Sequence, residues 1–207
     1  VRVTGLAAGV INNRRQLVEP YLRCRSWNDI AILEAARDLR SIPEISPGEI
    51  LTFAVGGQER RRVKLTGVVL ASFPDGDVYI RSGDSGIGAR LVRSDPLLKS
   101  GDYVEMIGFP EMDRFSARIV DAVTLDHLLG DGPAVPVTTR VSELLEGLHD
   151  SDLVSFTAEL SEQYRQESGG VLVLRDGART LHADTPALPE DLLPGTTVRV
   201  TGIALVE

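Results

Sequence analysis

The chain has 207 residues, 43% of them hydrophobic and 25% charged, a composition that excludes disorder over most of its length. Its net charge of −8 argues against nucleic acid as a partner, because proteins that bind nucleic acid usually gather basic residues to neutralise phosphates. A single cysteine, Cys24, excludes an internal disulfide and a cysteine-based zinc site, and no apolar run reaches the length of about 18 residues that a membrane-spanning helix needs.

The first 40 residues predict a β-hairpin followed by a helix. Apolar and polar residues alternate over residues 1–5, as they do in a half-buried strand. Asn12 and Asn13 are typical of a turn, and residues 16–24 have the composition of a second strand. Residues 30–39 then show apolar residues at helical spacing.

The middle of the chain predicts five short strands separated by glycine-rich turns. These strands are expected over residues 62–72, 77–81, 87–92, 103–109 and 115–125. Gly67 interrupts the first of them, as a bulge or a sharp bend would. Asp95 and Pro96 offer an N-cap and a first-turn proline for a short helix that holds Leu97 and Leu98.

The C-terminal third repeats this plan. The dipeptides at residues 42–43 and 135–136 are 93 residues apart, and the closing glycines Gly108 and Gly202 are 94 apart, so two landmarks share nearly one offset. Strands are expected over residues 152–160, 170–175, 180–183 and 197–204. Asp176-Gly177 is a strong signal for a two-residue hairpin turn.

Five strands with a short helix between the third and the fourth are the order of an OB-fold, a five-stranded Greek-key barrel. We therefore predict an all-β protein with short helices, built as tandem OB-like barrels. Its expected units are the C-terminal half of a truncated barrel at 1–40, a complete barrel at 41–130, and a barrel without its last strand at 131–207. A barrel that lacks a strand exposes an edge, so we expect the N-terminal hairpin to pack against an open edge of the last unit or of a neighbouring chain. Because Val1 already lies within a strand pattern, the chain is expected to be part of a longer protein.

OB-folds bind oligomers across strands two and three and the loops that frame them. On that basis the candidate ligand-binding residues are Phe73, Tyr79, Arg81, Arg90 and Phe115. Aromatic rings beside guanidinium groups suit the binding of a single strand of nucleic acid. The alternative is structural: Tyr79 is then a half-buried residue of the barrel surface, and the arginines are solvated.

Constellations that perform chemistry are missing from the sequence. His127, His149 and His182 are dispersed, and none has the spacing of a metal site. Gly86-Ile87-Gly88 precedes a strand, so it does not match a dinucleotide-binding fingerprint. We therefore expect no catalytic residues, no metal, no cofactor and no enzymatic activity in this chain.

Three features resemble the repeated OB-like modules in extracytoplasmic sensor regions of bacterial two-component histidine kinases. They are the Ile42-Pro43 and Val135-Pro136 entries with their Leu-rich short helices, the strand over residues 63–69, and the Leu-Leu-to-Gly stretches over 97–108 and 192–202. The resemblance implies a periplasmic sensory region that binds a small ligand or a protein, with contact to the membrane only through flanking segments. The open strand edges would allow a homodimer.

Two classes of function follow from the sequence. The acidic balance, the tandem repeats and the missing catalytic groups favour the sensory or interaction module. The alternative, a single-stranded nucleic-acid-binding OB-fold protein, is favoured by fold analogy together with Tyr79, Arg81 and Arg90. A carbohydrate-binding barrel lacks the aromatic platform that it would need.

Overall fold

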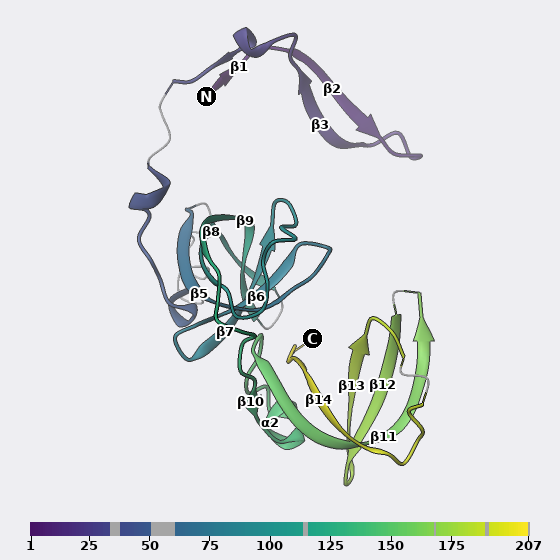
Figure 1. The fold of residues 1–207 in the computed structure, drawn as a ribbon. Helices are drawn as coiled ribbons and strands as arrows, with labels where there is room; N and C mark the ends of the chain where they lie inside the picture. Colours follow the sequence, from purple (N-terminus) through teal and green to yellow (C-terminus); the bar gives the residue numbers. More distant parts are fainter. Residues whose placement is uncertain (34–37, 51–60, 114–115, 168, 189–190, 207) are drawn as a thin grey trace. The chain divides into compact units, whose positions relative to one another are not determined.

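Residues 1–33, 38–50, 61–113, 116–167, 169–188 and 191–206 are described by a computed structural model of the chain (Figure 1). The contacts divide the chain into two units, Val1–Ser41 and Ile42–Glu207, and each is described by itself. Among the described residues, no helix is both long enough and apolar enough to cross a membrane.

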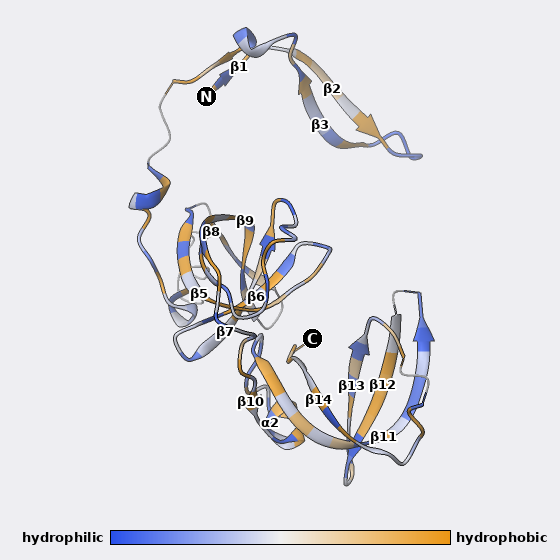
Figure 2. Cartoon of the chain, in the orientation of Figure 1, coloured by the Kyte–Doolittle hydropathy of each residue, from blue (hydrophilic) through white to orange (hydrophobic). Residues whose placement is uncertain are grey.

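The first unit consists of two small two-stranded sheets. Its elements are β1 (Arg2–Val3), β2 (Leu6–Ile11), β3 (Leu17–Arg23), β4 (Ile30–Ala31) and the 3-10 turns η1 (Trp27–Asp29) and η2 (Leu39–Ser41). β2 pairs antiparallel with β3, and β1 pairs antiparallel with β4. Hydrophobic stretches lie along β2 and β3, and the turn between them is hydrophilic (Figure 2).

The helix predicted over residues 30–39 does not begin where the sequence suggests. Ile30 and Ala31 form β4 instead, because their backbone pairs with β1. Ser26 caps the preceding 3-10 turn through a bond from the Asn28 amide, and the Asp29 carboxylate accepts the Ser26 amide in return. The reciprocal cap fixes the start of the turn, which ends at the extended residue Ile30, whose amide donates to the Trp27 carbonyl. Residues 34–37 of the predicted helix lie outside the described residues.

The second unit begins with a closed barrel of five strands. They are β5 (Val63–Ser72), β6 (Asp77–Ser82), β7 (Ser85–Leu91), β8 (Tyr103–Asp113) and β9 (Ser116–Leu128). The order around the barrel is β5-β6-β7-β9-β8, and β7 with β9 is the only parallel pair in it. This order is that of an OB-fold, so the predicted fold class is confirmed.

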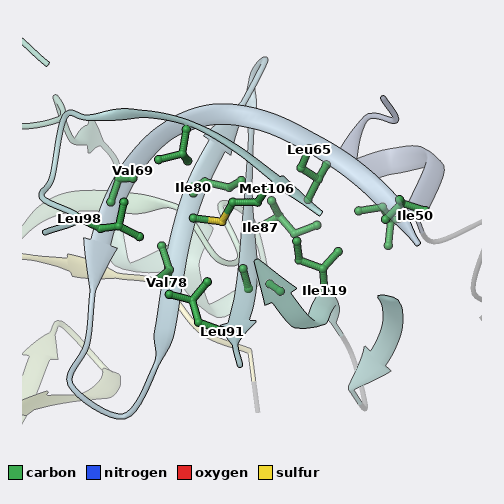
Figure 3. Close-up of a cluster of buried hydrophobic side chains, with 14 of the residues drawn as sticks. Ile50, Leu65, Val69, Val78, Ile80, Ile87, Leu91, Leu98, Met106 and Ile119 are labelled. Carbon is green, nitrogen blue, oxygen red and sulfur yellow. The ribbon is translucent and has the colours of Figure 1, made fainter. Parts of the chain in front are cut away.

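The barrel core follows from the alternation along each strand. On β6, Val78 and Ile80 are fully buried, whereas Asp77, Tyr79 and Arg81 point to the outer face. The inward residues of all five strands form one apolar cluster with Ile50 and Leu98 (Figure 3). Burying a side chain of this size contributes about 1.5–3 kcal/mol, so these residues supply most of what stabilises the barrel.

Gly67 is not the bulge that the sequence suggests. The register of β5 against β6 shifts between Val69 and Ala71, two residues further on. At Gly67, an added Cβ would overlap the backbone carbonyl of Arg81. The glycine is therefore needed because two strands approach each other closely at this position.

The short helix predicted around Leu97 and Leu98 is a turn. Asp95 caps it by accepting the Leu97 amide at 3.0 Å, and Leu98 alone of the two leucines is buried. The buried Asp102 carboxylate accepts a hydrogen bond from the Lys99 amide at 2.9 Å. This bond forms a second turn directly after Leu98. So few residues cannot offset the cost of nucleating a helix.

Asp102 links the start of β8 to the end of β9. Its carboxylate accepts the Gly130 amide at 3.0 Å and contacts Nε2 of His127 at 2.8 Å. The backbone bonds from Gly130 and Lys99, followed by the His127 contact, lower the pKa of Asp102 from 3.8 to about 2. The folded state therefore favours the ionised form of the Asp102 carboxylate.

We expect this carboxylate to make stability depend on pH in acid. Because the folded-state pKa is lowered, the contribution is complete above pH 3.8 and is lost as the pH falls toward 2. Asp102→Asn should unfold at lower urea concentration than the wild type at pH 7, and the gap should close between about pH 4 and pH 2. Urea unfolding followed by circular dichroism measures both, and a gap independent of pH would contradict the assignment.

The second sheet repeats the register of the first barrel. Its elements are β10 (Val137–Thr138), α2 (Val141–Leu145), β11 (Leu153–Gln166), β12 (Gly169–Asp176), β13 (Arg179–Thr185) and β14 (Thr197–Ile203). β11 pairs with β10, β12 and β14, and β12 pairs with β13. Val104 lies opposite Gly67 in the first barrel, and Val198 lies opposite Ala158 in the second sheet. The chain is thus built from tandem OB-like barrels.

Candidate functional site

A groove of about 550 Å³ lies on the outer face of the first barrel. Residues from β6, β7 and β9 form most of its lining, and three residues that lie just before β11 or just after β14 complete it. The lining consists of Asp77, Tyr79, Gly88, Ala89, Ser116, Ala117, Arg118, Ser151, Leu205 and Val206. Strands two and three of the barrel are β6 and β7, so the groove lies where OB-folds bind oligomers.

The floor of the groove is bare because β7 carries glycines on its outer face. Tyr79 lies directly opposite Gly88 on the neighbouring strand, and an added Cβ at Gly88 would contact the tyrosine ring at 3.4 Å. Gly86 allows a still closer approach, since a Cβ there would overlap the backbone of Ser151. The two glycines thus let an aromatic ring and the second OB-like sheet approach the strand.

Tyr79 is the aromatic residue of this groove. Its ring packs edge to face against Phe73, with the centroids 5.9 Å apart, in the geometry that aromatic pairs prefer. Burial raises the pKa of the Tyr79 hydroxyl, and the nearby Asp77 and Asp75 raise it further. The ring is therefore held in a fixed orientation, and its hydroxyl is neutral at physiological pH.

Two ion pairs border the groove. Arg90 pairs with Asp77 at 2.5 Å, and Arg118 pairs with Glu111 at 2.8 Å. Burial raises the pKa of Asp77 more than the Arg90 charge lowers it. Arg90 and Arg118 are thus each paired with a carboxylate. Because its pKa is raised, the Asp77 carboxylate takes up a proton at a higher pH than an ordinary aspartate does.

Arg81 has a different partner from the one that the sequence suggests. Its guanidinium donates to Oδ1 of Asp152 at 2.7 and 2.9 Å, to the Val135 carbonyl at 2.9 Å and to the Leu153 carbonyl at 3.3 Å. The Asp152 side chain is 5% exposed and that of Arg81 is 22% exposed. Arg81 therefore fastens the second OB-like sheet to β6, and that attachment brings Ser151 to the groove.

The structure brings some of the predicted site residues together. Tyr79 lines the groove, while Phe73 supports its ring and Arg90 binds the lining residue Asp77. Phe115 lies outside the described residues. Arg118, Ser151, Leu205 and Val206 were not predicted; only the alternation of β9 offered a signal for Arg118, and nothing local indicates the other three.

Metal chemistry has no visible site in the described part of the chain. No group of three His, Cys, Asp or Glu side chains gathers among those residues. The contact between Asp102 and His127 is a two-residue structural network at the barrel end, and His182 lies exposed on β13.

No family model matches the chain, and the solved structures that match it have low sequence identity and low TM-scores. One is described as a murine DNA-binding protein bound to double-stranded DNA. It has 10% identity, covers 66% of this chain and 84% of its own, and gives a TM-score of 0.37. The Ifi202 HINa domain in complex with a 20-base-pair duplex has 9% identity, coverages of 59% and 76%, and a TM-score of 0.33. A HIN1 domain in complex with a 12-mer duplex has 9% identity, coverages of 66% and 79%, and a TM-score of 0.32.

The function predicted from the sequence is not upheld by these structures. They are described as DNA complexes and not as sensor regions, so the predicted sensory role in a two-component kinase and the exclusion of nucleic acid as a partner find no support among them. The periplasmic location rested on the same resemblance and loses its support with it. The acidic total was a poor guide because most of the charge lies in residues 131–207, which carry five basic and thirteen acidic residues, and net charge does not describe one local face.

Proposed function

We propose that the groove on the first barrel binds single-stranded nucleic acid, with one base stacked on Tyr79. The observation that carries this proposal is a fixed aromatic ring on a floor of glycine, inside a groove of about 550 Å³. Pockets of about 300–1,000 Å³ enclose small organic groups, so the volume suits an unpaired nucleoside. Stacking on one aromatic side chain contributes about 1–3 kcal/mol per base.

The ion pairs at the groove define how phosphates would bind. Arg90 and Arg118 are held in place by Asp77 and Glu111, and a phosphate oxygen can replace either carboxylate. At most two phosphates would be neutralised in this way. The logarithm of the binding constant should then fall with the logarithm of salt concentration with a slope of only about −1.4, since each phosphate of a single strand contributes about −0.7.

Replacing the stacking ring tests the proposal. Tyr79→Ala should weaken the binding of a fluorescent single-stranded octanucleotide by about 5- to 150-fold, because one base loses its platform. Tyr164→Ala is the matched control, since Tyr164 is an exposed tyrosine on β11 in the second OB-like sheet. Fluorescence anisotropy with single-stranded and duplex DNA, at several salt concentrations, measures affinity, strand preference and the slope.

The Asp77→Asn variant tests the same proposal independently of Tyr79. Asp77→Asn removes the acid that competes with phosphate for Arg90, so the octanucleotide should bind more tightly. Binding that is equal in Tyr79→Ala and wild type, or that Asp77→Asn weakens, would overturn the assignment of the groove. If the protein prefers duplex DNA and Tyr79→Ala binds it as tightly as wild type does, the DNA binds outside this groove.

A further inference from the structure

A second groove, of about 520 Å³, lies on the side of β6 that faces β5. Residues from β5, β6, the start of β8 and two connecting segments line it. Six of the lining residues carry the argument below: Glu44, Thr66, Val68, Arg81, Tyr103 and Val135. Among the described residues, it shares no lining residue with the groove around Tyr79, so the two grooves are separate sites.

One wall of this second groove is the connection between β9 and β10, and hydrogen bonds hold it against the barrel. The Arg81 guanidinium donates to the Val135 carbonyl at 2.9 Å, and the Ala134 amide donates to the Ser100 hydroxyl at 3.2 Å. The Val135 side chain nevertheless stays 76% exposed. The apolar wall is therefore in place without a ligand, and a ligand would have to order little of the protein.

Tyr103 supplies an exposed aromatic ring. It is 45% exposed and follows the buried Asp102 at the start of β8. Val68 lies opposite Tyr103 on one neighbouring strand and opposite Arg81 on the other, and residues directly opposite each other share a face of the sheet. The ring and the aliphatic Val68 side chain thus form one continuous surface.

The polar side of the second groove is acidic. The exposed Glu44 carboxylate accepts the Thr66 hydroxyl. Glu105 lies opposite Thr66 and faces Lys64 at 3.5 Å. Arg81 adds no net charge, because its guanidinium donates to the Asp152 carboxylate at 2.7 and 2.9 Å. A phosphate would therefore be repelled here, whereas a cation would be attracted.

We propose that the second groove binds an arginine side chain from a basic peptide segment of a partner protein. The planar guanidinium lies over the Tyr103 ring and donates to the Glu44 carboxylate. Its methylene groups pack against Val68 and Val135. A volume of about 520 Å³ is larger than one side chain needs, so it also admits the neighbouring residues of the peptide.

The chemistry of the lining distinguishes this ligand from the alternatives. A neutral apolar group would cover the Glu44 carboxylate without giving it a hydrogen-bond donor, and that burial is unfavourable. A lysine ammonium is a compact, strongly hydrated charge, whereas a guanidinium both stacks on a ring and donates in a plane. An exposed ring beside a carboxylate matches the second of these cations.

A titration of the ¹⁵N-labelled full chain tests the proposal. The probe is a capped tripeptide with arginine between two alanines, and its control is the same peptide with citrulline, which keeps the shape and loses the charge. NMR shifts of the Gly67 and Ser82 amides report binding, since both residues line the second groove. The peptide is raised to millimolar concentration at low salt, because exposed charges are screened by salt.

The variants separate the ring from the carboxylate. Tyr103→Leu should weaken arginine-peptide binding by about 2- to 30-fold, and Glu44→Gln by about 2- to 5-fold. Tyr103→Phe keeps the ring and should bind as wild type does, which guards against a mere loss of folding. Tyr164→Leu is the matched control, since Tyr164 is 44% exposed and lies on β11.

The expected result is a shift of both amides by the arginine peptide, reduced in Tyr103→Leu and Glu44→Gln and unchanged in Tyr164→Leu. Equal binding of the citrulline peptide, equal binding by Tyr103→Leu and Tyr164→Leu, or no shift at either amide would overturn the proposal. Competition by the octanucleotide would also overturn it, by assigning the second groove to nucleic acid. Tyr79→Ala should bind the arginine peptide as wild type does, so failure of the nucleic-acid proposal would leave this result intact.

Discussion

Arg81→Ala should be among the most destabilising single substitutions in residues 42–207, costing about 2–4 kcal/mol of the free energy of unfolding. Removing one partner of a buried ion pair costs about 3–5 kcal/mol, because the other charge is left unpaired. Asp152 is that other charge, and it is almost fully buried. The lower range applies because the Arg81 side chain is 22% exposed.

In Arg81→Ala, unfolding should begin in the second OB-like sheet. Arg81 also donates to the carbonyls of Val135 and Leu153, which lie just before and within the strands of that sheet. Without these bonds Ser151 and its neighbours leave the groove wall, so binding of the octanucleotide should weaken as well. Urea unfolding followed by fluorescence of Tyr and by circular dichroism measures the free energy, and anisotropy measures the binding.

Arg175→Ala is the matched control for this prediction. Arg175 forms an ion pair with Glu159 at 2.7 Å, but both side chains are about half exposed, and such pairs contribute about 0–1 kcal/mol. Arg81→Ala/Asp152→Asn should recover part of the lost stability, since no unpaired charge is then buried. Equal effects of Arg81→Ala and Arg175→Ala would show that the clamp contributes no more than a surface pair.

The sequence was most informative where one strand pattern decides the structure. Alternation over residues 77–81 and turn glycines at Gly76 and Gly83 define β6, and all three features are local. The same local logic predicted the outward position of Tyr79. Wherever side-chain alternation and turn chemistry agree, the position of the strand in the sequence follows from them.

The errors arise where distant residues decide. Arg81 carries the pattern of a solvated or ligand-binding arginine, yet its partner Asp152 is 71 residues away in the chain. Leu205 and Val206 line the groove only because the second OB-like sheet lies against the first barrel. Residues 30–39 have apolar residues at helical spacing, but at Ile30 and Ala31 strand pairing with β1 overrides that preference. Contacts of this kind leave no local signature in a single sequence.

Gly101→Ala should destabilise the first barrel by about 2–5 kcal/mol, although it adds only one methyl group. Gly101 has a φ of +95°, where a residue with a side chain is strained by about 1–3 kcal/mol. The added Cβ would also overlap the carbonyl oxygen of Gly132, and overpacking costs about 1–3 kcal/mol more. Backbone cannot rotate away as a flexible side chain would, so the segment that leads from β9 to the second OB-like sheet must move.

Gly83→Ala separates the two causes. Gly83 has a φ of +61°, but an added Cβ there meets nothing within 4 Å, so only the backbone strain of about 1–3 kcal/mol remains. Gly101→Ala should exceed Gly83→Ala in urea unfolding, and it should also weaken the bond from the Gly130 amide to Asp102, which lies beside the displaced segment. If both alanine variants unfold at the same urea concentration, the close approach of Gly101 to Gly132 does not limit the position of that segment, and Asp102 alone must hold the end of β9 in place.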